Sequence, residues 1–190
     1  RGWFNVSLIL GTAIKGQAPY KAVVTHGFVN DEKGEKISKR KGNTVDPTEV
    51  ANTLGADILR YWVASVDYEN DVPVGQNILK HCGEQYRTIR NTLRFLLGNL
   101  KGYAPHDPAT SSPMDTWIVE QTDLLCADIL DAYESYEFGK VISGIHHFCA
   151  KEVSAIYADF IKDRMYCDGE DWPSRRAAQQ ACHYVLVRLV

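Results

Sequence analysis

Apolar residues recur at three- and four-residue intervals from about Gly75 to Leu100, a period that belongs to one regular structure. A helix completes a turn in about 3.6 residues, so this spacing places the apolar side chains on one helical face. They are Cys82, Tyr86, Ile89, Leu93, Leu96, Leu97 and Leu100. Three later segments show the same period, at residues 117–133, 142–160 and from about 173 to 190. We therefore expect four up-and-down helices with short connections over residues 73–190.

The first 45 residues have a different character, because short apolar runs alternate there with Gly and Pro. Val6–Leu10 and Ala22–Val24 have the length and composition of strands. The polar turn that contains Gly34 predicts that Gly27–Ile37 is a hairpin or the exit from a strand. This part of the chain is therefore expected to be a piece of an α/β unit.

Two short helices are predicted between these parts. Asp46 stands before a Pro at the first helical position, a pattern that caps a helix, and this helix should reach about Leu54 and end at Gly55. Asp57–Ser65 should form the second. The predicted fold class is thus mainly α, with a partial α/β piece, the C-terminal end of a Rossmann-type domain, followed by an up-and-down helical bundle.

Composition excludes several classes of protein. With 45% apolar residues among 190, the chain can bury a core, and disorder is excluded. No apolar run reaches the roughly 18 residues that a membrane-spanning helix needs, so we expect no membrane partner. The five cysteines have long spacings and no C-x-x-C pair, which suits neither a disulfide framework nor a zinc site. The sequence therefore predicts a soluble protein of a reducing cytoplasm.

Charge is segregated along the chain, although the net charge is only −3. Residues 102–139 contain eight acids and no Lys or Arg, whereas residues 85–101 contain no acid. The cations of the second segment are Arg87, Arg90, Arg94 and Lys101, and with Lys80 three of them, Arg87, Arg94 and Lys101, form a series spaced by seven residues. Such a stripe can attract the phosphates of a polyanion. It can equally be the solvated flank of a bundle helix, paired with the acidic helix that follows.

One loop gathers the groups that phosphate chemistry uses. Residues 36–43 read KISKRKGN, with four cations, one hydroxyl and one Gly. Lys supplies a mobile point charge, Ser and backbone N–H groups donate hydrogen bonds, and Gly lets the chain approach an anion. From the local chemistry alone, a solvated charged loop is the more ordinary interpretation, because short Lys-rich loops are common.

This loop, followed by Val45-Asp46-Pro47, resembles the KMSKS signature of class I aminoacyl-tRNA synthetases. The isoleucyl-tRNA synthetase family shows similar neighbouring segments, and the resemblance covers nearly all 190 residues in the right order. The segments are RGWF at 1–4, APYK at 18–21, THGFV at 25–29, GADILR at 55–60, IRNTLRFLLGNL at 89–100, and KDR at 162–164.

The resemblance implies an enzyme that activates isoleucine with ATP and transfers it to isoleucine tRNA. Lys39 would contact the ATP phosphates, Lys36 and Ser38 would complete the mobile loop, and Mg²⁺ would accompany ATP. The basic stripe (Arg87, Arg90, Arg94, Lys101) would contact tRNA. Two positions depart from the family pattern: Ile37 replaces Met, and Arg40 replaces the final Ser. The second change puts the loop geometry in doubt more than the contact with ATP.

The family also uses an H-x-G-H element, an amino-acid pocket, an editing domain and a zinc site, and none of them is found in this sequence. We therefore expect an internal fragment, cut at both ends, of a monomeric synthetase. The expected division is residues 1–45 for the catalytic domain, 46–72 for connecting helices and 73–190 for the truncated anticodon-binding domain. A freestanding helical module that binds RNA or protein, without catalysis, is the alternative.

Several other residues are expected to be structural. Trp3, Trp62 and Trp117 are interpreted as core or interface aromatics, and Trp172 as a staple ahead of the last helix. Of His146 and His147, which cannot form a metal pair, one should be packed in the core. Cys167 and Cys182 are interpreted as small core residues, and Arg164 as part of a solvated helix surface.

Overall fold

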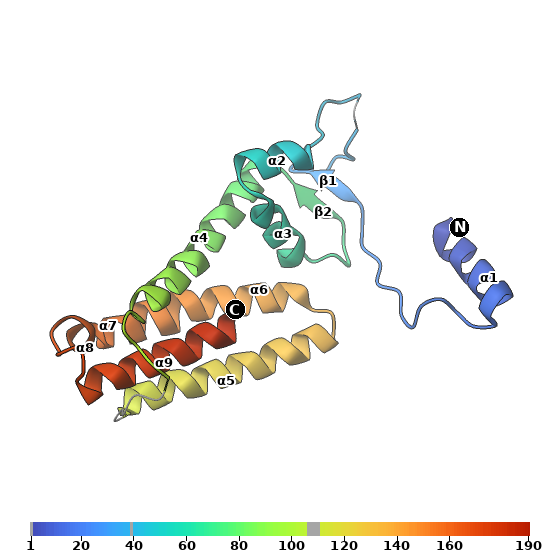
Figure 1. Cartoon of the computed structure of the whole chain (residues 1–190). Coiled ribbons are helices and arrows are strands. Elements are labelled where there is room, and N and C mark those ends of the chain that lie inside the picture. Colours follow the sequence, from blue (N-terminus) through green and yellow to red (C-terminus); the bar gives the residue numbers. More distant parts are fainter. Residues whose placement is uncertain (1, 39, 106–110) are drawn as a thin grey trace.

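The computed structural model describes residues 2–38, 40–105 and 111–190 (Figure 1). Its elements follow the chain from a detached helix, through a small sheet with two short helices, to a helical bundle. They are α1 Trp3–Lys15, β1 Val29–Asp31, α2 Pro47–Thr53, α3 Ala56–Ser65, β2 Val72–Val74, α4 Gln76–Gly98, α5 Pro113–Glu134, α6 Phe138–Phe148, the π-helix η1 Cys149–Tyr157, α7 Ala158–Phe160, α8 Lys162–Tyr166 and α9 Pro173–Leu189. The predicted fold class, mainly α with a partial α/β piece, is confirmed.

The predicted strand at Val6–Leu10 is wrong, because these residues lie inside α1. A short apolar run does not distinguish a strand from a helix, and this one continues to Gly16, whose left-handed conformation (φ 69°) ends the helix. Ala22–Val24 has no regular structure either. α1 buries none of its residues and lies apart from the rest of the chain (Figure 1). Trp3, expected in a core or interface, is 70% exposed and stacks on Phe4.

The two strands form a parallel sheet in which Val29 pairs with Val72 and Asp31 with Val74. The predicted exit from a strand is confirmed, since β1 turns back and Asn30 makes an antiparallel bridge to Lys36. Gly27 enters this sheet at a point where an added Cβ would lie 2.2 Å from the Asn70 carbonyl oxygen, so only Gly fits there.

Both predicted short helices are confirmed. The Asp46 carboxylate accepts a hydrogen bond from the Thr48 amide at 2.8 Å and caps α2, as expected. The helices α2, α3 and the start of α4 enclose a hydrophobic cluster with the two strands. Its buried members are Val50, Ile58, Tyr61, Trp62, Val72, Val74, Leu79 and Cys82. Trp62 donates its indole N–H to the Pro73 carbonyl at 3.2 Å, which fixes α3 against the strand β2.

α4 runs from the sheet to the bundle, where α5 lies beside α6 and α9 (Figure 1). A second hydrophobic cluster fills the bundle. Its buried members are Leu96, Ile118, Phe148, Val153, Tyr157, Ile161, Met165, Ala178, Ala181, Cys182 and Val185. The four predicted helical segments are confirmed, with α4 and α9 close to their expected bounds.

The third segment differs from a regular α-helix, because residues 149–157 form a π-helix between α6 and α7. A side chain of the neighbouring helix enters its hydrogen-bond pattern. The buried Thr92 hydroxyl of α4 lies 3.3 Å from the Cys149 carbonyl and 2.9 Å from the Ser154 hydroxyl, and 3.0 Å from the Thr88 carbonyl of its own helix. This contact across 57 residues holds the widened helix against α4.

Arg164 is not part of a solvated surface, as the sequence analysis expected. It joins the Asp115 carboxylate through two hydrogen bonds of 2.7 and 2.8 Å, and the two side chains are 16% and 4% exposed. The Tyr157 hydroxyl donates to the same carboxylate at 2.6 Å. Burial alone raises the pKa of Asp115, but the hydrogen bonds from Arg164, Tyr157 and the Ser112 amide together hold it below its usual value.

Three further expectations have different outcomes. The expectation that His146 or His147 is packed in the core is wrong, since α6 places His146 at an intermediate and His147 at an exposed position. Cys182 is buried in the bundle, as expected, but Cys167 is exposed. Of the tryptophans, Trp62 is buried and Trp117 packs against the bundle cluster, whereas Trp172 is 58% exposed.

Candidate functional site

The loop of residues 36–43 follows the turn at the end of β1 and projects from the small sheet (Figure 1). Lys36, Ser38 and Arg40 belong to the described residues, and Lys39 lies outside them. Ile37 packs against the cluster around the sheet, in agreement with its interpretation as an apolar anchor. The loop is therefore fixed on one side by a partly buried contact, while Lys36, Arg40 and Lys41 are exposed.

The Asn43 side chain closes the loop at its base. Its amide oxygen accepts a hydrogen bond from the Ser38 backbone N–H at 2.9 Å. Its amide nitrogen donates to the Asp31 carboxylate at 2.8 Å and approaches the Lys36 carbonyl at 3.4 Å. Lys36 and Ser38, two residues predicted from the sequence, are therefore brought together by one side chain that the sequence analysis did not single out.

The cations of the loop differ in how far they are already neutralised. Lys41 forms an ion pair of 2.8 Å with Glu35, and this hydrogen bond raises the pKa of Lys41. Lys36 lies over the Phe28 ring, with its Nζ 5.9 Å from the ring centroid. Arg40 is exposed, and its backbone N–H points at the Ser38 hydroxyl at 3.3 Å. Lys36 and Arg40 therefore keep their charges available to an anion, which is what phosphate binding requires.

The turn before the loop also contacts α4. Glu32 accepts hydrogen bonds from the backbone N–H groups of Asn77 and Ile78, at 2.9 and 3.4 Å, and from the Asn77 side chain at 3.1 Å. A carboxylate at this place satisfies unpaired amides of the first helical turn and complements the helix dipole. Gly75 permits the approach, since an added Cβ would lie 2.2 Å from the Glu32 side chain. The loop and the helix with the basic stripe are thus joined.

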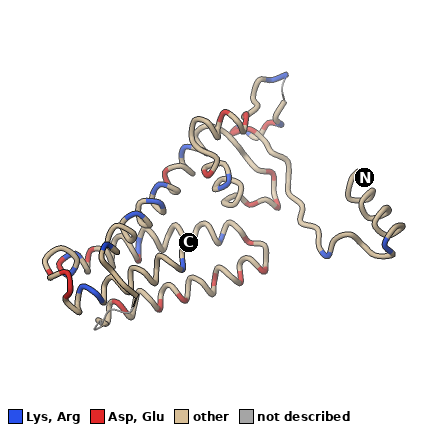
Figure 2. The backbone as a smooth tube through the Cα atoms, viewed as in Figure 1, with Lys and Arg blue, Asp and Glu red and all other residues tan. Residues whose placement is uncertain are grey.

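The cations of the basic stripe recur along α4 and in the turn that follows it (blue in Figure 2). Lys80, Arg87, Arg90, Arg94 and Lys101 are all exposed. Arg87, Arg90 and Arg94 are three and four residues apart and therefore share one helical face. Within the described part of the chain, none of these five cations forms an ion pair. The suggested pairing with the acidic helix α5 is not found there, so the guanidinium groups keep their donors.

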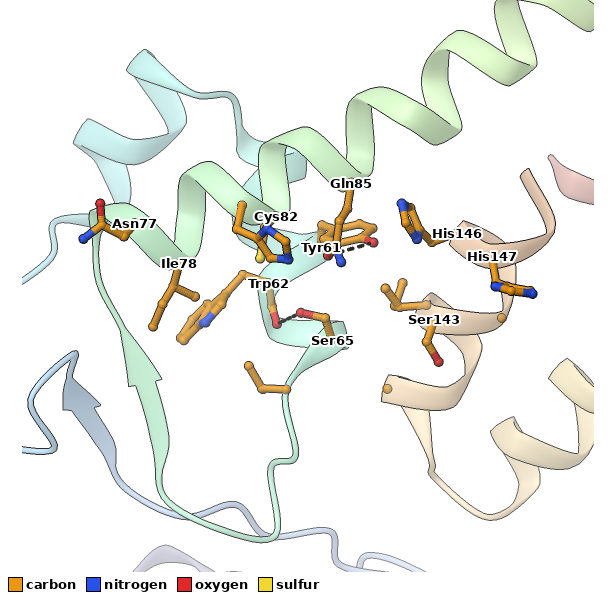
Figure 3. A pocket seen from close by; sticks show the side chains of 15 residues that line it. Tyr61, Trp62, Ser65, Asn77, Ile78, Cys82, Gln85, Ser143, His146 and His147 are labelled. Carbon is orange, nitrogen blue, oxygen red and sulfur yellow. Dashed lines mark hydrogen bonds between the residues drawn. The ribbon is translucent and has the colours of Figure 1, made fainter. Parts of the chain in front are cut away.

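A cleft with a volume of about 1040 Å³ lies elsewhere, between α3, α4 and α6 (Figure 3). Tyr61, Cys82, Gln85, Ser143 and His146 line it, together with further residues of the same helices. Burial raises the pKa of Tyr61 to about 12 and also raises that of Cys82, so both groups are protonated at neutral pH. No residue predicted from the sequence as a site lies in this cleft.

Two further features concern partners. Among the described residues, no group of three or more His, Cys, Asp or Glu side chains is arranged to hold a metal ion. Within the same residues, no helix combines the length and the apolar character needed to cross a membrane.

Comparison with known proteins identifies the family. The model of class I tRNA synthetases (I, L, M and V) matches residues 1–75, and that of the anticodon-binding domain of tRNA ligases matches residues 115–190. The isoleucine–tRNA ligase of Desulfitobacterium hafniense (strain DSM 10664 / DCB-2) is 50% identical over the whole chain. The chain belongs to the class I tRNA synthetases. The resemblance seen in the loop and its neighbours is thereby confirmed.

Other relatives of this synthetase chain carry the same name. The isoleucine–tRNA ligases of Carboxydothermus hydrogenoformans and Chromohalobacter salexigens are each 49% identical over all of it. The chain spans only about a fifth of the length of these curated relatives, 21% and 20% respectively. Among solved structures, the Agrobacterium radiobacter K84 agnB2 LeuRS, in a ternary complex with tRNA and LeuAMS, aligns with 98% of this chain and 23% of its own. The TM-score is 0.70 at 19% identity, which supports the class I synthetase fold.

Proposed function

We propose that this chain is a segment of an isoleucine–tRNA ligase, which activates isoleucine with ATP and transfers it to isoleucine tRNA. The observation that carries the proposal is the identity of 50% to an isoleucine–tRNA ligase over all 190 residues, since it includes the cationic loop and the basic helix. Because the chain spans 21% of that relative, the substrates and the reaction are assigned to the longer protein.

In this proposal the loop binds the ATP phosphates. Lys39 contacts them directly, with Lys36 and Ser38 completing the site. The departing pyrophosphate gains negative charge in the transition state, and donors placed there accelerate the reaction more than donors that bind only ground-state ATP. The exposed Lys36 ammonium and the pinned Ser38 support this role. Mg²⁺ would arrive with the phosphates, because Asp31 and Glu35, the acids nearest the loop, already accept hydrogen bonds.

The loop assignment is tested by isoleucine-dependent exchange between ATP and pyrophosphate. In the full-length protein, Lys39→Ala and Lys36→Ala should each lower the exchange rate by at least about tenfold, as expected for lost transition-state contacts. Lys33→Ala, an exposed lysine three residues before the loop, is the control and should leave the rate unchanged. Exchange that persists undiminished in Lys39→Ala would refute the assignment of ATP contact.

The 190-residue chain alone should not activate isoleucine. Its sequence has no H-x-G-H element, and the family resemblance gives that element half of the ATP site. Isoleucine-dependent exchange by the purified chain would contradict this, and the longer protein serves as the positive control.

The basic stripe is proposed to contact the backbone of isoleucine tRNA. Its exposed, unpaired cations support this, since each phosphate contact releases counterions and makes binding dependent on salt. In the full-length enzyme, Arg87 and Arg94 are replaced together by Ala. The slope of the logarithm of the tRNA binding constant against the logarithm of the salt concentration should then become shallower by about 1.5 to 2. Replacing Lys140 and Lys162, which pair with Glu137 and Asp159, should change this slope much less. If both double variants gave the same slope, the proposed contact between the basic stripe and tRNA would be excluded.

We retain the division into residues 1–45, 46–72 and 73–190 as part of this proposal, along with a monomeric enzyme in the cytoplasm, where translation takes place. The zinc site of the family would lie outside this segment. A helical module that binds RNA without catalysis is the second candidate, favoured by the same stripe. It would be supported if the full-length protein bound tRNA but gave no isoleucine-dependent exchange.

A further inference from the structure

One carboxylate, that of Asp31, holds both the turn before the cationic loop and the residue that closes the loop. One of its oxygens accepts the backbone N–H groups of Lys33 and Glu35, at 3.0 and 2.8 Å. Its other oxygen accepts the Asn43 side-chain amide at 2.8 Å. Asn43 in turn accepts the Ser38 backbone N–H at 2.9 Å. A continuous chain of hydrogen bonds therefore leads from the end of β1 to the middle of the loop.

The starting point of this chain is fixed. Asp31 is the last residue of β1 and pairs with Val74 of the parallel strand β2. The next residue, Glu32, is bound to the first turn of α4 through three hydrogen bonds. Because a strand and a helix terminus hold the turn in place, the position of Asp31 is set by the fold and not by the loop.

The charge on Asp31 strengthens the chain. The hydrogen bond from Asn43 is the main reason that the pKa of Asp31 lies below its usual value, and the Glu35 and Lys33 amides contribute in the same direction. The carboxylate is thus ionised at neutral pH, and hydrogen bonds to an ionised acceptor are stronger than neutral ones.

We propose that Asp31 and Asn43 are positioning residues that latch the cationic loop, and that this latch sets the place of Ser38 and Lys36 at the phosphates. The inference rests on the proposed function, because the latched loop is the one assigned to ATP. Because both ends of the eight-residue loop are held, the loop loses less conformational entropy when it binds an anion. The latch touches no substrate itself and acts through Ser38 and the backbone of Lys36.

The polarity of the latch allows a sharp test by exchanging its two side chains. Asn43→Asp brings two carboxylates together. In Asp31→Asn, the one oxygen at position 31 accepts from the Lys33 and Glu35 amides, so its new NH2 group faces the Asn43 NH2 group and that bond is lost. In the double variant Asp31→Asn/Asn43→Asp, an amide at position 31 donates to a carboxylate at position 43, which still accepts from the Ser38 N–H. The only bond that is not restored is the weak one to the Lys36 carbonyl, 3.4 Å long. Glu35→Gln, which breaks the exposed ion pair to Lys41, is the matched control.

Two readouts are measured on the full-length protein. The first is hydrogen exchange, followed by mass spectrometry, in the peptide that contains the Ser38 amide. It should become about fivefold to tenfold faster in each single variant and return toward the original rate in the double variant. The second is isoleucine-dependent exchange between ATP and pyrophosphate. There kcat should fall about tenfold or more in the single variants, with a smaller change in the KM for ATP, and should recover in the double variant.

Each outcome decides between the alternatives. If hydrogen exchange or kcat in the single variants matches that of Glu35→Gln, or if the double variant is no better than the singles, the latch is refuted. A lowered melting temperature with unchanged kcat per folded molecule would also refute it, since that pattern belongs to a purely structural contact. If the unaltered protein gives no isoleucine-dependent exchange, the proposed function fails, and hydrogen exchange at Ser38 still decides whether the latch exists.

Discussion

Replacing Arg164 by Met should destabilise the bundle strongly, because it leaves the buried Asp115 carboxylate without its cation. The carboxylate is 4% exposed and accepts four hydrogen bonds, two from Arg164, one from Tyr157 and one from the Ser112 amide. Breaking a buried pair by removing one partner costs about 3–5 kcal/mol. Arg164 Nε is itself buried without a partner among the described residues, so the loss should lie near the lower end of that range, about 3 kcal/mol.

The effect should depend on pH in a defined direction. In the unaltered chain the folded-state pKa of Asp115 is depressed, so its stabilising contribution is complete above its unfolded pKa, 3.8, and is lost as the pH falls through the folded pKa. In the variant, burial without Arg164 raises this pKa, so the carboxylate takes up a proton at higher pH and its penalty is relieved. The difference in unfolding free energy between the two proteins should therefore be largest at pH 7 and should shrink as the pH falls toward 4.

The assay is urea unfolding of the 190-residue chain, followed by far-ultraviolet circular dichroism at pH 7 and pH 4. Arg60→Ala is the control, because its ion pair with Asp57 is 77% and 59% exposed and should cost less than about 1 kcal/mol. The double variant Asp115→Asn/Arg164→Met should recover part of the loss, since the buried charge is removed. A loss for Arg164→Met as small as that of the control, or one that is equal at both pH values, would refute the reasoning.

Three further outcomes are expected from the same structure. Gly75→Ala should destabilise the chain by about 1–3 kcal/mol, because the new Cβ would collide with Glu32, whereas Gly98→Ala, with nothing within 4 Å, should not; urea unfolding compares them. Thr92→Val should cost about 1–3 kcal/mol, since it removes a buried hydroxyl that contacts the Cys149 carbonyl and the Ser154 hydroxyl of the π-helix as well as the Thr88 carbonyl of its own helix; Thr122→Val, whose hydroxyl bonds within its own helix, should cost less. Iodoacetamide at pH 8 should alkylate Cys167 in the folded chain but spare Cys149 and Cys182, because burial raises the pKa of both thiols to about 12; mass spectrometry of the labelled peptides checks this.

Local patterns in the sequence predict the helices whose signals are local. The Asp46 cap and the apolar period of α4 are examples, since both involve residues within a few turns of each other. The same approach fails for Val6–Leu10, because a run of five residues with four apolar side chains fits a strand and a helix equally well. Local patterns also cannot predict the π-helix, because the hydroxyl that contacts its first carbonyl belongs to Thr92 on a different helix.

The candidate site shows the same limit. The cations and the hydroxyl of the loop are contiguous in the sequence, and their chemistry can be recognised there. The latch is not contiguous, because Asp31 and Asn43 are 12 residues apart and only the return of the chain after β1 brings them together. An Asp at the start of the turn and an Asn after the Gly were visible signals, but either residue alone is typical of any polar turn.

Arg87 and Arg164 show why residue type and spacing do not settle the role of a cation. The two residues looked alike in the sequence, as cations on the surface of predicted helices. In the structure, Arg164 is 16% exposed and donates two hydrogen bonds to one carboxylate. Arg87 is exposed and forms no ion pair within the described residues. A guanidinium group that is already paired with a buried carboxylate binds a phosphate weakly. A guanidinium group whose N–H donors are not in use can form charge-assisted hydrogen bonds to a phosphate. The proposed tRNA contact therefore rests on the exposed guanidinium groups that form no ion pair within the described residues.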